Sequence, residues 1–264
     1  MILLNAFLYT TPVWLITFTL FANVFLFYLL GSKTGRYIKS KRPESKADGI
    51  GPLEGALLGL LSLLLGFTLS QSASRYDTRR ALIIHEANDI GTAILRSDMY
   101  QDSIKIQFKN DLKEYVETRI AYYETIDEGE ISKSLSEAEK ISDRIWDRVV
   151  ISSKKNPDFV RDNQMIPAVN SMIDIVNNRD AGRLARVPDP IIYLLMILTV
   201  LGSFIIGYAK KENKIDWIIL TLYSVMTIAT IFVILDIDRP RRGFIQTSVP
   251  HEKINQLRNL FHAE

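Results

Sequence analysis

Four stretches of this chain are long and apolar enough to cross a lipid bilayer, and they constrain its fold more than any other feature. A helix needs about 20 residues to cross the hydrocarbon core. The first stretch follows neither a charged start nor a small-residue cleavage pattern, so it is interpreted as a retained helix and not as a secretory signal. The sequence therefore predicts four transmembrane helices, over Pro12–Leu30, Leu53–Ser70, Pro190–Tyr208 and Trp217–Leu235.

More than a hundred residues separate the second and third stretches, and they are rich in charge. Apolar residues recur there at helical spacing, and no long alternation typical of a strand occurs. No proline lies between Leu53 and Asn156, so the second helix can continue beyond the membrane. We predict an all-α protein in four parts: transmembrane helices 1 and 2 with a basic loop (1–72), a helical extramembrane domain (73–188), transmembrane helices 3 and 4 (189–236) and a polar C-terminal tail (237–264).

The distribution of basic residues does not decide which side of the membrane carries the helical domain. Cytoplasmic loops usually carry the excess of Lys and Arg. Here nine basic residues lie near the span ends on each side. On the side of the short loop between the first two spans they are Lys33, Arg36, Lys39, Lys41, Arg42, Lys46, Lys210, Lys211 and Lys214, and on the other they are Arg75, Arg79, Arg80, Arg179, Arg183, Arg186, Arg239, Arg241 and Arg242.

Composition and motifs exclude several classes of function. The chain has no cysteine, which excludes disulfides, a thiol nucleophile and cysteine metal sites, and its three histidines are far apart in sequence. A net charge of +2 gives no reason to expect a nucleic-acid partner. Nucleophile elbows, phosphate-binding glycine loops and catalytic triad spacings are absent from the sequence. We therefore predict neither an enzyme nor a cofactor or metal site.

Small residues gather on one face of the second span. At 100° per residue this face holds Gly55, Gly59, Ser62, Gly66, Ser70 and Ala73, with Leu63 and Phe67 at its flank. Two interpretations are open. Small side chains let helices pack closely in lipid, which makes the face a packing seam. Repeated around a symmetric oligomer, the same face forms a pore wall, with Leu63 and Phe67 as an apolar constriction and Ser70, Gln71 and Ser74 as its wetter continuation.

Two parts of the sequence resemble a known family. The run LLLGFTLSQSASRYDTRR, Leu63–Arg80, resembles the second transmembrane helix of bacterial bestrophins. Its continuation HEANDIGTAILR, His85–Arg96, is similar to the E-A-N-x-I-G motif of the bestrophin-like family, a family of unknown function. After the last span, LDIDRPRRGFIQTSVP, Leu235–Pro250, is similar to the D-R-P-x-x-G tail of that family. The polar residues of these motifs are Tyr76, Asp77, Arg79, Arg80, Glu86, Asn88, Asp236, Asp238 and Arg239.

This resemblance implies an oligomeric ion channel in the bacterial cytoplasmic membrane. Bestrophins are homo-oligomers, pentameric in known cases, whose second helices surround a central pore for small anions such as chloride. Carried over to this chain, the pore neck falls on Gly59, Leu63 and Phe67, with Ser70 and Ser74 lining the pore. Gly59 departs from the family because it has no apolar side chain. The alternative from another class is a membrane-anchored scaffold or sensor without conductance.

The polar motif residues have more than one expected role. The HEAND sequence lacks the second histidine that a zinc helix needs. We therefore expect Glu86 and Asn88 to form hydrogen bonds or ion pairs with Arg79, Arg80 or Arg96 from neighbouring helices. Three roles are open for the arginines after the fourth span: anchoring lipid headgroups, pairing with the Tyr76–Arg80 segment of a neighbouring subunit, and attracting a permeating anion. Arg241 stands where bestrophins have a phenylalanine before the calcium-binding run of the animal proteins, so we predict no calcium site.

Overall fold

The computed structural model of the chain describes residues 8, 10–41, 51–210, 216–245 and 248–261. Helices make up most of this part of the chain, and no strand occurs within it. Four of the helices are long and apolar enough to cross a membrane. The prediction of an all-α fold with four transmembrane helices is confirmed.

Contacts between residues divide the chain into two units. The membrane unit comprises residues 1–74 and 186–245, and the charged unit comprises residues 75–185 and 246–264. Helix α3 (Gly51–Arg96) contributes to both, because it continues without a break past the apolar part that ends near Ser70. Its 46 residues correspond to about 69 Å of helix, roughly twice the thickness of the hydrocarbon core. The second predicted span is therefore the first half of a much longer helix.

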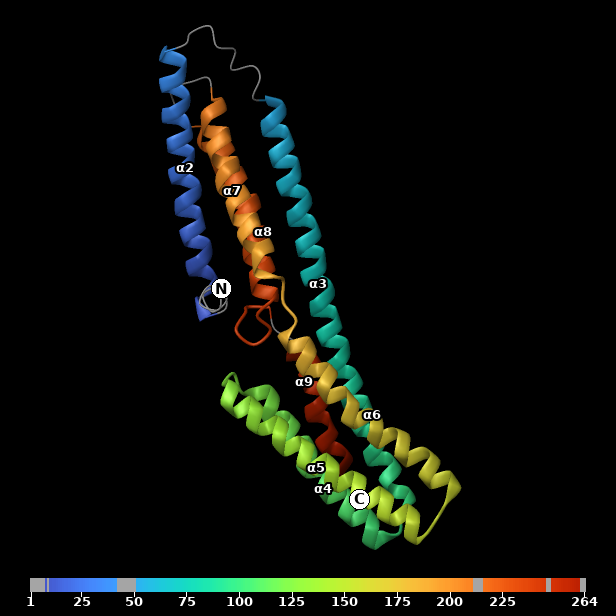
Figure 1. The fold of residues 1–264 in the computed structure, drawn as a ribbon. Coiled ribbons are helices and arrows are strands. Elements are labelled where there is room, and N and C mark those ends of the chain that lie inside the picture. The colour runs from blue at the N-terminus through green and yellow to red at the C-terminus, as the bar shows by residue number, and fades with distance from the viewer. Residues whose placement is uncertain (1–7, 9, 42–50, 211–215, 246–247, 262–264) are drawn as a thin grey trace. The chain divides into compact units, whose positions relative to one another are not determined.

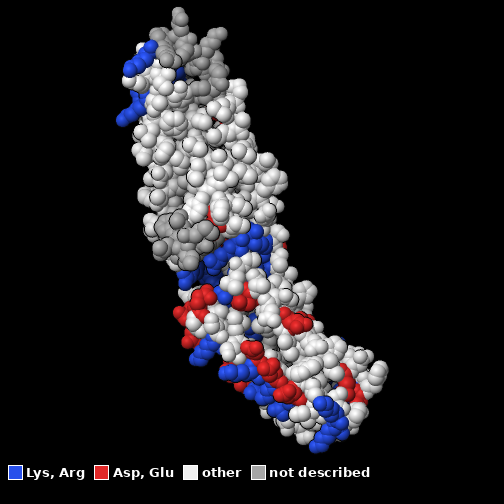
Figure 2. All heavy atoms as spheres, in the orientation of Figure 1, with Lys and Arg blue, Asp and Glu red and all other residues white. Residues whose placement is uncertain are grey.

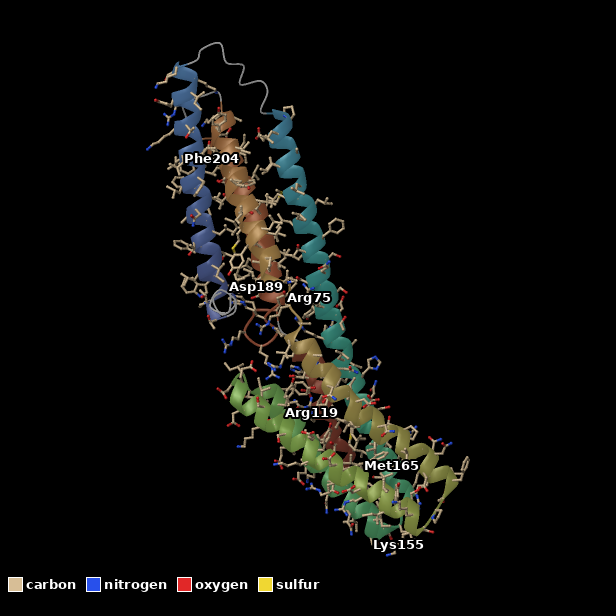
Figure 3. The ribbon with its side chains drawn as sticks, viewed as in Figure 1. Arg75, Arg119, Lys155, Met165, Asp189 and Phe204 are labelled. Atoms are coloured by element: carbon tan, nitrogen blue, oxygen red, sulfur yellow. The ribbon has the colours of Figure 1, made fainter. Side chains whose placement is uncertain are left out.

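In the membrane unit, α2 (Val13–Lys41) lies against α7 (Asp189–Ala209), with α8 (Trp217–Ile237) beside them (Figure 1). Glycines bring the backbones of α2 and α7 together. A Cβ atom at Gly35 would lie 2.6 Å from the carbonyl oxygen of Tyr208, and one at Gly207 would collide with the carbonyl oxygen of Tyr28. Gly31 meets the backbone of Phe204, labelled in Figure 3, in the same way. The small-residue seam within this unit thus joins α2 to α7.

The charged unit surrounds a second hydrophobic core. It contains the end of α3, η2 (Ser97–Met99), α4 (Asp102–Glu124), α5 (Glu128–Lys155), α6 (Phe159–Leu184), α9 (Ser248–Asn255) and η3 (Gln256–Phe261). Asp127 and Asp158 cap the starts of α5 and α6 by accepting backbone N–H bonds of 3.0 Å each. Acidic and basic side chains cover much of the surface of this unit, whereas the middle of the membrane unit carries almost none (Figure 2).

Candidate functional site

The small-residue face of α3 is exposed in the single chain. Leu63 is 55% and Phe67 61% exposed, and Ser70 and Ser74 are exposed as well. Nothing lies within 4 Å of a Cβ atom built at Gly55, Gly59 or Gly66. The opposite side of the helix packs inward through Leu61, Leu65, Thr68 and Ser72, which are buried. The helix therefore turns its small face, with Leu63 and Phe67, away from the rest of its own unit.

This orientation limits what the small face of α3 can pack against. In the apolar part of α3, 17% of the residues are buried, compared with 39% in α7 and in α8, and the ribbon of α3 stands apart from α2, α7 and α8 (Figure 1). Gly55, Gly59 and Gly66 do not form a seam with other described helices of the same chain. A packing seam at this face would have to involve a second copy of the chain.

Arg79 holds the end of α6. Its side chain is buried and donates hydrogen bonds to the carbonyl oxygens of Gly182, at 3.0 Å, and Ala185, at 2.6 Å. The last carbonyl groups of a helix have no partner within the helix, and a basic side chain satisfies them. Of the neighbouring motif residues, Asp77 and Arg80 are exposed, and the guanidinium of Arg80 lies 5.7 Å from the ring centre of Tyr76.

Glu86 is fully buried and is the acceptor at the centre of a charge cluster. It accepts hydrogen bonds from Nε of Arg119 at 2.5 Å, from Nε of Arg179 at 3.1 Å and from the hydroxyl of Tyr123. The expectation that Glu86 pairs with Arg79, Arg80 or Arg96 of a neighbouring helix is wrong as to the residues: its partners are Arg119 of α4 and Arg179 of α6. Asn88 is exposed, and its side chain makes no hydrogen bond within the described part of the chain.

The electrostatics of this cluster keep Glu86 ionised. Glu86 lies beyond the apolar part of α3, in the charged unit. Burial alone would raise the pKa of the Glu86 carboxyl, but the charges of Arg119 and Arg179 and the hydrogen bonds from Arg119 and Tyr123 outweigh it, so the pKa is lowered. Burial and the nearby Glu86 carboxylate raise the pKa of the Tyr123 hydroxyl. The cluster therefore holds one negative and two positive charges.

The polar residues at the end of α8 and just after it fold the chain back onto the membrane unit. Asp236 accepts the backbone N–H groups of Phe244 and Ile245 at 2.9 and 2.8 Å. Asp238 accepts the N–H group of Val187, just before α7, at 2.6 Å. Arg239 donates to the carbonyl oxygens of residues 11, at 2.6 Å, and 8. The contacts of Arg239 with the backbone of its own unit differ from the three roles expected for the arginines of this segment, whereas the roles of Arg241 and Arg242 remain predictions.

A glycine makes this turn possible. A Cβ atom at Gly243 would lie 2.5 Å from the carbonyl oxygen of Asp236 and 3.1 Å from that of Arg239. The motif D-R-P-x-x-G thus pairs an aspartate that binds the returning backbone with a glycine that allows its close approach. Among the described residues there is no group of three or more His, Asp or Glu side chains placed to hold a metal ion.

Comparison with known proteins identifies the family. Residues 16–250 match the model of the bestrophin-like domain. The chain belongs to the bestrophin-like family. The sequence resemblance to this family is confirmed. Its motifs, within Leu63–Arg96 and Leu235–Pro250, lie inside the matched region. No curated protein matches the chain.

Solved structures of bestrophin homologues share the fold of this bestrophin-like chain. A bacterial bestrophin homologue from Klebsiella pneumoniae superposes with a TM-score of 0.65 at 13% identity, covering 94% of this chain and 99% of the other. A tryptophan-to-alanine variant of that homologue gives a TM-score of 0.71 at 11% identity, covering 96% of this chain and 99% of its own. At such low identity the likeness concerns the fold alone.

Sequence reasoning missed the buried partners of the bestrophin-like α3 motif. Arg119 lies in the middle of an apolar stripe of α4 that is otherwise formed by Leu112, Tyr115, Val116, Tyr122 and Tyr123. An arginine at the centre of such a stripe has to be buried with a counter-charge, so the sequence did contain an indication that Arg119 is a buried partner. Arg179 gave a weaker indication, because it stands at the end of the apolar stripe of α6 that includes Met172 and Ile175, where a long side chain can still reach water.

Proposed function

We propose that the chain assembles as a homo-oligomer around a central pore that passes small anions. In this proposal α3 of each copy faces the axis, as the second helix does in bestrophins. Leu63, Phe67 and Gly59 form the neck, and Ser70 and Ser74 line its continuation. The number of copies follows bestrophins, which are pentamers, and the site of action is the cytoplasmic membrane of a bacterium. The proposal involves no enzymatic step.

The exposure of the small face of α3 is the observation that supports this proposal most directly. A helix face that contacts only lipid gains nothing from glycines and serines, because lipid tails favour large apolar side chains. This face instead combines glycines with hydroxyl groups and two large apolar side chains, and it is turned away from its own unit. Such a surface requires either water or the same helix of another copy beside it.

The chemistry of the face fits a narrow passage for small anions. From Gly55 to Ser74 the helix carries no charged side chain, so no fixed negative charge would repel an anion. Leu63 and Phe67 lie four residues apart, about one helical turn, and would form two successive apolar rings that gate by excluding water. The hydroxyl groups of Ser70 and Ser74 would then donate hydrogen bonds to a partly hydrated anion.

Anion flux into liposomes tests the proposal. The purified protein is reconstituted, and chloride or bromide entry is followed with a halide-quenched dye. Phe67→Ala and Leu63→Ala should raise the flux or change the preference between the two halides, because they widen the apolar neck. The matched control is Phe18→Ala: Phe18 is 66% exposed on α2 but lies outside the proposed pore, so its removal should leave the flux unchanged.

Three outcomes would contradict the pore. Absence of flux from the wild type and from both neck variants would favour the alternative, a membrane-anchored scaffold or sensor, in which the same substitutions change only assembly or stability. An equal change of flux from Phe18→Ala would show that loss of any exposed phenylalanine disturbs the protein in the membrane. A monomer in native-like lipid would remove the axis on which the pore depends.

A further inference from the structure

Arg119 combines complete burial with an incomplete set of hydrogen bonds. Its side chain, labelled in Figure 3, extends from α4 into the core of the charged unit and has no exposed surface. Nε donates to Glu86 at 2.5 Å. Nη1 and Nη2 have no hydrogen-bond acceptor in the described part of the chain. Buried guanidinium groups are normally hydrogen-bonded, because water is no longer available to them.

The cluster around Arg119 also has a surplus of positive charge. Glu86 is the one carboxylate within ion-pair distance of Arg119 in the described residues, and Arg179 shares it at 3.1 Å. Asp180, which accepts a 3.4 Å hydrogen bond from Tyr122, pairs with Arg183 at 2.8 Å, and Glu128 pairs with the same arginine at 3.0 Å; in the described residues neither carboxylate forms an ion pair with Arg119 or Arg179. Two guanidinium groups therefore rely on a single carboxylate, which leaves one positive charge without a counter-charge.

Aromatic rings compensate for part of this surplus. The guanidinium carbon of Arg119 lies 4.4 Å from the ring centre of Tyr122 and 5.7 Å from that of Tyr123. The faces of these rings attract a cation, but they carry no net charge and accept hydrogen bonds weakly. They stabilise the flat surface of the guanidinium, whereas the N–H groups of Nη1 and Nη2 point along its edge and need an acceptor in that plane.

We propose that Arg119 binds a small monovalent inorganic anion, such as chloride, through Nη1 and Nη2, as a buried ligand that completes the Glu86–Arg119–Arg179 cluster. A neutral water molecule would accept hydrogen bonds but leave the charge unbalanced. A side chain of a second copy cannot reach Arg119, because the group is enclosed within its own chain. The bound anion stabilises the charged unit, and this role is independent of conduction, since the proposed pore residues belong to the membrane unit.

Bromide provides a direct test, because it resembles chloride and scatters anomalously. Crystals of the full-length wild-type protein grown in sodium bromide should show an anomalous peak within hydrogen-bond reach of both Nη atoms of Arg119. Arg144 is the internal control: it is 42% exposed and already paired with Asp111 and Glu114, so it should show no peak. Absence of a peak at Arg119 in the wild type would overturn the proposal and leave the tyrosine rings or a water as the partners.

A second measurement in solution checks the role of the anion in stability. The melting midpoint of the wild type in detergent should rise when chloride replaces gluconate at constant ionic strength. At a chloride concentration of 100 times the dissociation constant, binding shifts the unfolding equilibrium by about 100-fold. Arg144→Met should keep this dependence and Arg119→Met, which has neither the charge nor the donors, should lose it. Equal wild-type midpoints in the two salts would overturn the proposal, and this comparison remains decisive if Arg119→Met does not fold.

Discussion

Replacing Glu86 with glutamine should destabilise the charged unit severely while changing the volume of the core very little. The carboxylate accepts hydrogen bonds from Arg119, Arg179 and Tyr123, and it is the counter-charge of both arginines. A glutamine side chain keeps one acceptor oxygen. Its amide nitrogen, however, is a donor and would face at least one N–H or O–H donor of the cluster.

The size of the effect follows from burial. Glu86 and Arg119 have no exposed surface, so removing the carboxylate leaves two guanidinium groups in the core without a counter-charge. Breaking a buried ion pair on one side costs about 3–5 kcal/mol. For a chain of this length that corresponds to a fall in the melting midpoint of roughly 10 °C. Glu114→Gln is the matched control, because the Glu114 side chain is about half exposed, and its loss should cost at most about 1 kcal/mol.

Thermal unfolding of the purified protein in detergent measures both variants. A double-mutant cycle with Arg119→Met adds a stricter condition. Glu86→Met leaves two buried guanidinium groups without a carboxylate in the wild type but only that of Arg179 in the Arg119→Met background, so the two changes together should cost less than the sum of the single changes. A Glu86→Gln variant as stable as Glu114→Gln would refute the account of Glu86 as the counter-charge of the core. Additive costs in the cycle would refute the coupling to Arg119.

Further predictions concern the cluster and the close backbone contacts. The pKa of Glu86 is lowered from 4.5 in the folded chain, so its contribution to stability is complete above pH 4.5 and is lost as the pH falls through the lower pKa of the folded chain. The difference in melting midpoint between wild type and Glu86→Gln should therefore become smaller in acid. Gly207→Ala should cost about 1–3 kcal/mol in a melting experiment, because the new methyl group meets a backbone carbonyl, whereas Gly51→Ala, at the start of α3 and outside the small face, with nothing within 4 Å, should cost nothing measurable. Gly243→Ala should loosen the turn held by Asp236, with faster proteolysis after α8 as the readout, and an unchanged cleavage rate would contradict the steric account.

The elements of the fold could be predicted because their causes are local. Apolar runs of the right length mark transmembrane helices whatever their neighbours are, and the absence of proline after Pro52 allowed α3 to continue to Arg96. The family could be inferred for a similar reason: the motifs in α3 and after α8 are short and contiguous. Their polar residues, such as Glu86 and Asp236, are buried structural groups with fixed partners.

The partners of those groups could not be predicted, because they depend on how helices pack. The spacing of Ala81, Ile84, Asn88, Gly91 and Leu95 indicates an amphipathic face. Of these residues Gly91 alone is buried, and the main buried face is rotated from it, through Ile83, Glu86, Ala87 and Ile90. Both faces contain apolar residues at helical intervals, so the pattern alone cannot choose between them. Which glycines bring two helices together could not be predicted either, since glycines in α2, α3 and α7 look alike in sequence and differ only in what lies beside them.

The contact between α2 and α7 has a consequence for motion in the membrane unit. Helices that meet through side chains can slide or rotate by exchanging rotamers, but Gly31, Gly35 and Gly207 place one backbone directly against the other. A shift of α2 along α7 would drive these backbones into the next bulky residue. The two helices should therefore move as one rigid body. Spectroscopic labels on α2 and α7 should keep a constant separation, while a label on the small face of α3 reports any change of state.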